Sequence, residues 1–362
     1  MLLQALLRLS AIAALVEALP GKSATKPDDC QEIRIPITVE VPRFLISTSI
    51  NNDWDAAALT FNLTRRDFGQ ASFPLPISGT SAPVKSTYEV GATLCGTGAT
   101  TLILTHGILE SKLYWQPDFI DSDKYNFIKS AVEAGYSVLS YDRIGVAVLE
   151  ALVAHVRSNN TTTTSALPRK VVLVGHSYGA YISVAAAASN QSRNAVDAVV
   201  LTGFAGGFSH FAPFLAGAGL RVARDRQLDR WGALDSGYLT TADLYSDAYI
   251  YYHDGDYERR IAEWTHTRGS EPFAVGELPS LLATNITYGA VQAPVQLVQG
   301  LYDVSACGGN CTGQVQEFRG NLTGALAVET VEDLPAGHNL NLHLVAPKAF
   351  GMMFDFLKRQ GL

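Results

Sequence analysis

Ser177 has the sequence surroundings of a nucleophile. It lies in the motif GHSYG (175–179), directly after the apolar run 170–174 and before a stretch of helical pattern. A strand that turns at once into a helix forces its central residue into a strained backbone conformation, and glycine on both sides removes Cβ atoms that would collide there. The turn also points a helix N-terminus at the hydroxyl, which favours developing negative charge. The alternative is a glycine-rich turn whose serine only caps the helix.

A serine hydroxyl needs a general base, and the base needs an orienting carboxylate. His338 lies in AGHN (336–339), just past the last predicted strand, and Asp303 ends GLYD (300–303), just past another. We therefore predict Ser177 as nucleophile, His338 as base and Asp303 as acid. The alternatives are His343 for the base and Asp333 or Asp142 for the acid.

Acyl transfer also needs hydrogen-bond donors for the negative oxygen of the transition state. One candidate is the backbone N–H of Tyr178, which follows the nucleophile, and the other is the N–H of Ile108 in an HG turn after the apolar run 101–105. His106 in that turn is expected to be a structural strut. Asp142 is expected to form an ion pair with Arg143 and so fix its loop.

These residues need a scaffold of buried strands. Apolar runs without alternation predict strands at 101–107, 136–141, 170–174, 197–202, 295–300 and 325–331. Segments of helical spacing separate several of them, near 127–135, 147–156 and 181–188, and a last helix is predicted at 347–359. Strands alternating with helices indicate right-handed βαβ units and an α/β fold with a mostly parallel sheet.

Two segments depart from this alternation. The N-terminal extension (19–98) includes 33–41, whose alternating apolar and polar residues predict a strand, and it is expected to be rich in strands. Between about 203 and 290 an aromatic-rich stretch predicts helices at 211–226, 241–253 and 257–264. We expect this stretch to be a helical lid inserted into a single catalytic domain (99–362).

Taken together, HG (106–107), YDRIG (141–145), GHSYG, GLYD and AGHN resemble the α/β-hydrolase superfamily, specifically secreted fungal-type members with an AB hydrolase-1 core. The resemblance implies that fold and a cofactor-independent hydrolysis of an ester or related bond by Ser177, Asp303 and His338. Epoxide hydrolases and haloalkane dehalogenases of the superfamily carry Asp at the nucleophile position, so Ser177 argues against both. In the superfamily YDRxG usually leads into a longer loop, whereas here a helical pattern follows at once. The explanations are a natural short loop, a mis-spliced gene model or a decayed enzyme.

Several features indicate the secretory route. Residues 1–18 predict a signal peptide, with an amphipathic N-terminal helix as the alternative. Four cysteines suit an oxidising compartment and allow three pairings, of which we favour Cys30–Cys95 with Cys307–Cys311 because the second pair is only four residues apart. A zinc site is the alternative, but no histidine lies at ligand spacing from either pair. Sequons for N-glycosylation occur at Asn62, Asn159, Asn160, Asn190, Asn285, Asn310 and Asn321.

Composition narrows the possible functions. The chain has 362 residues and a formal net charge of -7, which argues against nucleic acid because phosphate binding needs a basic surface. No transmembrane segment, cofactor or metal is predicted. We expect a secreted serine esterase or lipase-like hydrolase acting on a small lipophilic or aromatic ester. The alternatives are a secondary-metabolite hydrolase or acyltransferase, a peptidase, and a non-catalytic binding protein on the same fold.

Overall fold

A sheet of eight strands runs through the centre of the computed structural model, which describes residues 30–64, 74–119, 121–158 and 170–362. The strand order is β1-β4-β6-β5-β7-β8-β12-β13. The strands are β1 (Gln31–Val41), β4 (Val84–Cys95), β5 (Thr100–Thr105), β6 (Ser137–Tyr141), β7 (Lys170–His176), β8 (Ala198–Thr202), β12 (Val295–Gly300) and β13 (Val328–Leu334). The strands from β6 to β13 pair in parallel, whereas β4 pairs antiparallel with both β6 and β1. The predicted α/β fold with a mostly parallel sheet is confirmed.

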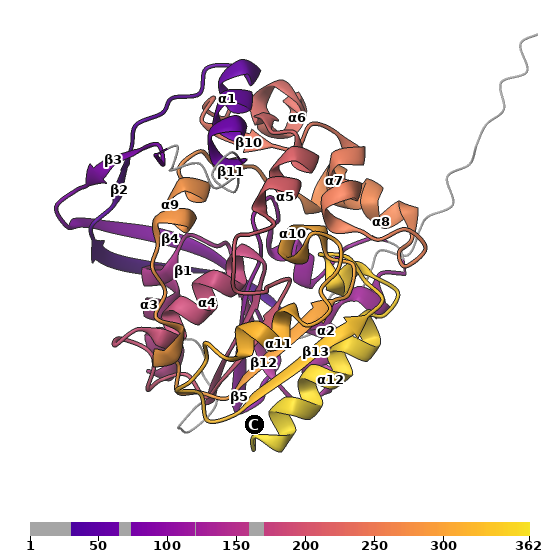
Figure 1. Ribbon diagram of the computed structural model, residues 1–362. Helices are drawn as coiled ribbons and strands as arrows, with labels where there is room; N and C mark the ends of the chain where they lie inside the picture. The colour runs from indigo at the N-terminus through magenta and orange to yellow at the C-terminus, as the bar shows by residue number, and fades with distance from the viewer. Residues whose placement is uncertain (1–29, 65–73, 120, 159–169) are drawn as a thin grey trace, which may run out of the picture.

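Helices cover both faces of this sheet (Figure 1). Leu102 and Leu104 of β5 pack with the residues of α2 and α12, and Ile103 between them packs with α3 and α4 on the other face. Because successive side chains of a strand point to opposite faces, a strand covered on both faces is apolar throughout. The covering helices are α2 (Phe127–Glu133), α3 (Val146–Arg157), α4 (Tyr178–Ala188), α11 (Gln314–Arg319) and α12 (Ala346–Arg359).

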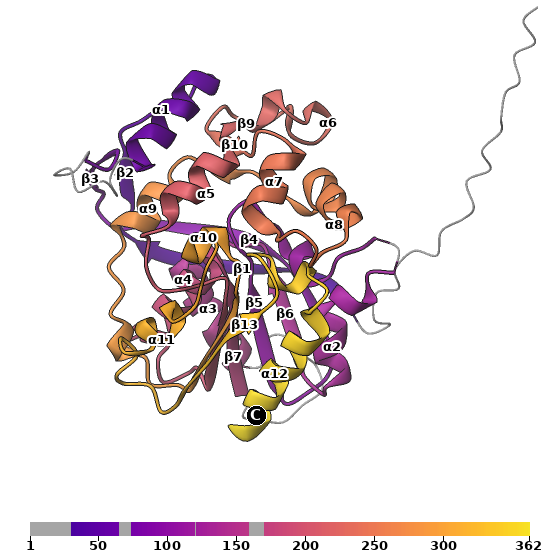
Figure 2. The ribbon, with the colours of Figure 1, turned by 45° about the vertical axis from the view of Figure 1, so that its right-hand side comes forward.

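The chain between β8 and β12 forms a layer above the C-terminal ends of the parallel strands (Figure 2). Its elements are α5 (Phe211–Ala218), β9 (Arg221–Val222), α6 (Leu228–Trp231), β10 (Tyr238–Thr240), α7 (Leu244–Tyr251), α8 (Arg259–Trp264), β11 (Phe273–Ala274) and α9 (Glu277–Ala283). The predicted helix 211–226 is wrong beyond Ala218. Gly219 there adopts a left-handed conformation (φ 54°) that ends α5, and the chain then enters a sheet of three short strands.

The N-terminal segment contains a helix that the sequence did not predict. Helix α1 (Asp53–Thr64) lies beside α5 and β9, and the Asp53 carboxylate accepts a hydrogen bond from the Val222 N–H at 2.9 Å. Strands β2 (Phe44–Ile46) and β3 (Ile77–Thr80) pair with each other, while β1 and β4 extend the central sheet. The segment contains strands as expected, but α1 was not predicted because its apolar positions do not form a clear helical stripe.

Both disulfide bonds have the predicted pairing, Cys30 with Cys95 and Cys307 with Cys311. The first joins the start of β1 to the end of β4, and the second joins the last residue of the short helix α10 (Val304–Cys307) to Cys311 in the loop that follows. Because the sulfur atoms of each pair form a disulfide bond, these four cysteines do not provide the thiolates that the alternative zinc site would need. Across the part of the chain that the structure describes, no helix combines the length and apolarity needed to cross a membrane. The predicted signal peptide (1–18), Asn159 and Asn160 lie outside the described residues.

Candidate active site

Ser177 sits in a sharp turn between β7 and α4, with φ 54° and ψ −121°. The neighbouring glycines are required by close backbone contacts. A Cβ atom at Gly175 would lie 2.5 Å from the Gly179 carbonyl oxygen, and one at Gly179 would lie 2.1 Å from the Thr105 carbonyl oxygen. The turn is therefore pressed against the end of β5, and the Ser177 N–H is fixed by a 2.9 Å hydrogen bond to the Thr202 carbonyl.

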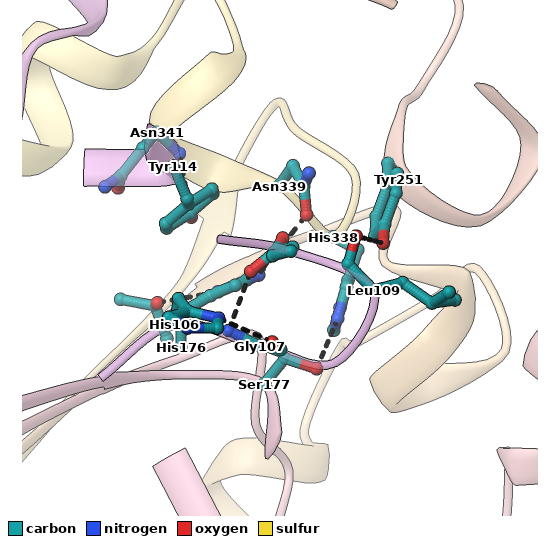
Figure 3. Close-up of polar contacts among 12 residues, drawn as sticks. His106, Gly107, Leu109, Tyr114, His176, Ser177, Tyr251, His338, Asn339 and Asn341 are labelled. Atoms are coloured by element: carbon teal, nitrogen blue, oxygen red, sulfur yellow. Dashed lines mark hydrogen bonds and ion pairs between the residues drawn. The ribbon is translucent and has the colours of Figure 1, made fainter. Parts of the chain in front are cut away.

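The structure brings Ser177, His338 and Asp303 into one hydrogen-bonded chain. The Ser177 hydroxyl donates to His338 Nε2 at 2.8 Å (Figure 3), and His338 Nδ1 donates to Asp303 Oδ2 at 2.7 Å. The three residues follow β7, β12 and β13, whose C-terminal ends meet at the same edge of the sheet. This arrangement can deprotonate the serine hydroxyl and hold the resulting imidazolium beside a carboxylate.

Asp303 is fully buried, and its two oxygens are held from different directions. Oδ1 accepts from the Ala306 N–H at 2.7 Å, and Oδ2 accepts from Gln299 Nε2 at 2.6 Å. Burial alone would raise the pKa of Asp303, but the charge of His338 and these hydrogen bonds hold it below its usual value. Burial would lower the pKa of His338, but the charge of Asp303, the hydrogen bond that His338 donates to it and the charge of Glu110 raise that pKa. Ionised Asp303 thus makes His338 the stronger base.

His343, the alternative base, secures the loop that carries His338. Its Nε2 accepts from the Gly337 N–H at 2.9 Å and its Nδ1 donates to the Asn339 carbonyl at 2.8 Å, so both nitrogens are occupied by backbone. Burial lowers the pKa of His343 to about 4, and the ring stays neutral. The alternative acids lie elsewhere: Asp333 is exposed on β13, and the Asp142 carboxylate lies against Gly91 of β4.

The loop after β5 carries the candidate oxyanion donors. The N–H groups of Ile108 and Tyr178 have no acceptor within the described residues, and both residues line the cavity at Ser177. Tyr251 braces this loop from α7, because its hydroxyl lies 3.3 Å from the carbonyl oxygens of Ile108 and Leu109 (Figure 3). His106 Nδ1 donates to the Gly107 carbonyl at 2.9 Å and Nε2 accepts from the Arg143 N–H at 3.2 Å, which are the contacts of a strut.

A family model described as "Alpha/beta hydrolase family" matches residues 102–350, more than half of the chain. This chain belongs to the alpha/beta hydrolase family. A monoacylglycerol lipase of Paleococcus ferrophilus has a similar structure, with a TM-score of 0.53 and 14% identity, covering 75% of this chain and 100% of that one. A thermostable carboxyl esterase from Bacillus coagulans is also similar in structure, with a TM-score of 0.51 and 14% identity, covering 75% of this chain and 94% of that one. No curated protein matches this alpha/beta hydrolase in sequence.

In this alpha/beta hydrolase Arg143 pairs with Glu277 of α9, so the expected Asp142–Arg143 ion pair is wrong. Nη1 of Arg143 lies 2.7 Å from Glu277 Oε2, and its guanidinium stacks over the Tyr178 ring at 4.5 Å. Successive residues at the end of a strand point to opposite sides. Asp142 therefore faces β4 while Arg143 faces the turn at Ser177.

The cavity beside Ser177 of this alpha/beta hydrolase is small, about 40 Å³. The insert supplies most of its apolar wall through Phe208, Phe211, Phe214, Leu278 and Leu281. Ser177 and His338 also line this space. An ester carbonyl at Ser177 would therefore place one of its two substituents among aromatic and aliphatic side chains.

Sequence reasoning missed several residues that shape the site of this alpha/beta hydrolase. Gln299 donates to Asp303, Tyr251 and Glu110 support the loop after β5, and Glu277 holds Arg143. Of these, Glu110 had a usable signal: it is an acidic residue in an otherwise apolar stretch, three positions after Gly107. Gln299 lies only four residues before Asp303, in the predicted strand 295–300, whereas Tyr251 and Glu277 come from distant segments that no local pattern marks.

Proposed function

We propose that this alpha/beta hydrolase cleaves a carboxylic ester through an acyl-Ser177 intermediate, with His338 as the base and Asp303 as the acid. The observation that carries the proposal is the hydrogen-bonded chain from the Ser177 hydroxyl through His338 to a buried carboxylate, at 2.8 Å and 2.7 Å. His338 takes the serine proton as Oγ attacks the ester carbonyl. It then gives that proton to the departing alcohol, and a water molecule activated in the same way releases the acid.

The N–H groups of Ile108 and Tyr178 stabilise the negative oxygen of each tetrahedral intermediate. Their free donors beside Ser177 support this role, because fixed dipoles in a site of low water content stabilise developing charge strongly. The helix dipole of α4 adds to the field, since Tyr178 is its first residue.

The substrate is a lipophilic or aromatic ester, and the acyl or alcohol group beside Ser177 is small or flat. The apolar wall of Phe208, Phe211 and Phe214 and the volume of about 40 Å³ support this choice. A longer chain enters only when the insert (about 203–290) moves as a lid. The rest of residues 99–362, extended at its N-terminal side by 19–98, forms the hydrolase domain.

The protein is secreted after removal of residues 1–18 and carries N-linked glycans. Two disulfide bonds support an oxidising compartment. The sequon residues Asn190, Asn285, Asn310 and Asn321 are exposed, whereas Asn62 is half-buried on α1. Expression in a secreting eukaryotic host, followed by an N-glycosidase digestion, tests this: the secreted protein should lose apparent mass and begin at or near Leu19.

Two measurements test the catalytic proposal. A fluorophosphonate probe should label the wild type, and Ser177→Ala should abolish labelling while leaving the fold intact. p-Nitrophenyl esters of graded chain length should then give the highest kcat/KM with the shortest acyl groups. A folded wild type that neither takes the probe nor hydrolyses any ester would contradict the enzyme and favour a binding protein.

A further inference from the structure

Glu110 is a buried carboxylate that the proposed reaction does not use. It lies in the loop after β5 and is only 5% exposed. Its Oε2 accepts from the Gly107 N–H at 2.7 Å, and its Oε1 lies 3.4 Å from His176 Nε2. An ionised carboxylate taken out of water is costly unless hydrogen bonds and charges compensate it. The position of such a group beside the candidate oxyanion loop therefore calls for a function.

Gly107 is held between Glu110 and the nucleophile. A Cβ atom at Gly107 would lie 2.7 Å from Glu110 Oε2 and 3.0 Å from Ser177 Cβ. The peptide that follows Gly107 carries the N–H of Ile108, so any rotation of Gly107 redirects that donor. Leu109, the next residue, has a left-handed φ of 60°, and the whole turn is thus bent around the Glu110 carboxylate.

His176 extends this contact to two other loops of the site. Its Nδ1 lies 3.0 Å from Thr202 Oγ1, and its Nε2 lies 3.3 Å from Asn339 Oδ1, next to His338. The His176 ring also stacks on Tyr114 at 4.4 Å (Figure 3 labels both residues). Glu110 and His176 therefore connect the turn after β5, the turn at Ser177 and the loop that carries His338.

We propose that Glu110 is a positioning residue for the hydrolysis reaction: its carboxylate orients the Ile108 N–H toward the substrate carbonyl oxygen and places a second negative charge beside His338. This inference rests on the proposed function. Geometry carries the first part, through the 2.7 Å hydrogen bond to Gly107. Geometry also carries the second part, because Glu110 Oε1 lies 3.4 Å from His176 Nε2 and the centroids of the His176 and His338 rings lie 4.9 Å apart.

Four titratable groups face His338 from the elements packed against it: Asp303 after β12, Glu110 after β5, His176 at the end of β7 and Tyr251 of α7. Burial would raise the pKa of Glu110, but the contacts with His176 lower it further than burial raises it. The pKa therefore lies below its usual value, and Glu110 is an anion at neutral pH. Its charge adds to that of Asp303 in raising the pKa of His338. Removing the charge of Glu110 therefore lowers the pH at which His338 becomes a free base.

The rate of fluorophosphonate labelling, measured from pH 5 to 9, tests both parts without a substrate. Glu110→Gln keeps an oxygen that can accept from Gly107, so the plateau rate should stay within about threefold of the wild type. Its acid limb should move to lower pH. Glu110→Leu removes the acceptor as well, and the plateau rate should fall about 10²-fold, as for a misplaced oxyanion donor. Asp333→Asn removes an exposed carboxylate of the same charge and should leave both quantities unchanged.

Separate outcomes identify separate failures. An acid limb that does not move in Glu110→Gln, with a normal plateau in Glu110→Leu, overturns the inference. If the leucine variant does not fold, the acid limb of the folded glutamine variant alone decides. A wild type that takes no probe refutes the proposed function itself, which is a different result from an active wild type with unaltered variants.

Discussion

Ser177 holds a backbone conformation that glycine adopts with little strain, so substitutions there should reverse the usual order of alanine and glycine in stability. Its φ of 54° and ψ of −121° lie outside the regions favoured by other residues. Such strain costs of order 1–3 kcal/mol, whereas glycine loses roughly 0.5–1 kcal/mol relative to alanine through the greater freedom of the unfolded chain. Ser177→Ala and Ser177→Gly both lose the hydrogen bond to His338, which cancels in their comparison. The glycine variant should be the more stable by about 1 kcal/mol.

Urea and thermal unfolding of both variants measure this difference. Ser130, in the regular helix α2, provides the matched control, because alanine there should be more stable than glycine by about 1 kcal/mol. The probe should label neither variant at position 177, which separates stability from activity. If the alanine variant is more stable than the glycine variant at position 177 as well as at position 130, backbone strain is not the reason for the sequence GHSYG.

Three further predictions concern the same site. Gly179→Ala places a Cβ 2.1 Å from the Thr105 carbonyl oxygen and should lower the free energy of unfolding by roughly 3 kcal/mol, measured in urea. The charge of Asp303 raises the pKa of His338 above its usual value of 6.5, so kcat/KM for a short p-nitrophenyl ester should increase with pH and reach half of its maximum above pH 6.5. Asp303→Asn should shift this midpoint to lower pH and reduce kcat by about 10³–10⁴-fold. Glu277→Gln weakens the ion pair with Arg143 that holds α9, whose Leu278 and Leu281 line the cavity. The ratio of kcat/KM for p-nitrophenyl decanoate to kcat/KM for p-nitrophenyl acetate should therefore rise about fivefold, and an unchanged ratio would show that α9 does not limit acyl size.

The parts of the fold that follow from local pattern were predictable. The central strands are mostly apolar and do not alternate with charged residues because helices cover both faces. The structure has β5, β7, β8 and β12 within a few residues of the predicted ranges. The turn at Ser177 was equally visible, because its steric demands fall on Gly175 and Gly179, its neighbours in sequence.

The insert was less predictable because long-range contacts decide its structure. Apolar spacing continues past Ala218, and only the left-handed Gly219 and the pairing of Val222 with Leu239 end the helix. The partner of Arg143 shows the same limit. Asp142 is adjacent in sequence, but the pleat of β6 turns it away and leaves Arg143 to a carboxylate more than a hundred residues later.

The connection between β6 and α3 is shorter than the loop that usually follows the YDRxG motif in the α/β-hydrolase superfamily. The hydrogen-bonded chain of Ser177, His338 and Asp303 nevertheless forms. Helix α3 begins at Val146, directly after the YDRIG motif, and the insert covers this side of the turn instead. The Arg143 side chain is only 5% exposed, and a guanidinium at such depth needs an anionic partner, which α9 supplies through Glu277. The same helix places Leu278 and Leu281 in the cavity wall, so one ion pair holds the wall beside Ser177. The Arg143–Glu277 pair and the hydrogen-bond distances from Ser177 to Asp303 argue against a decayed enzyme, because a chain that had lost its activity would not be held to either.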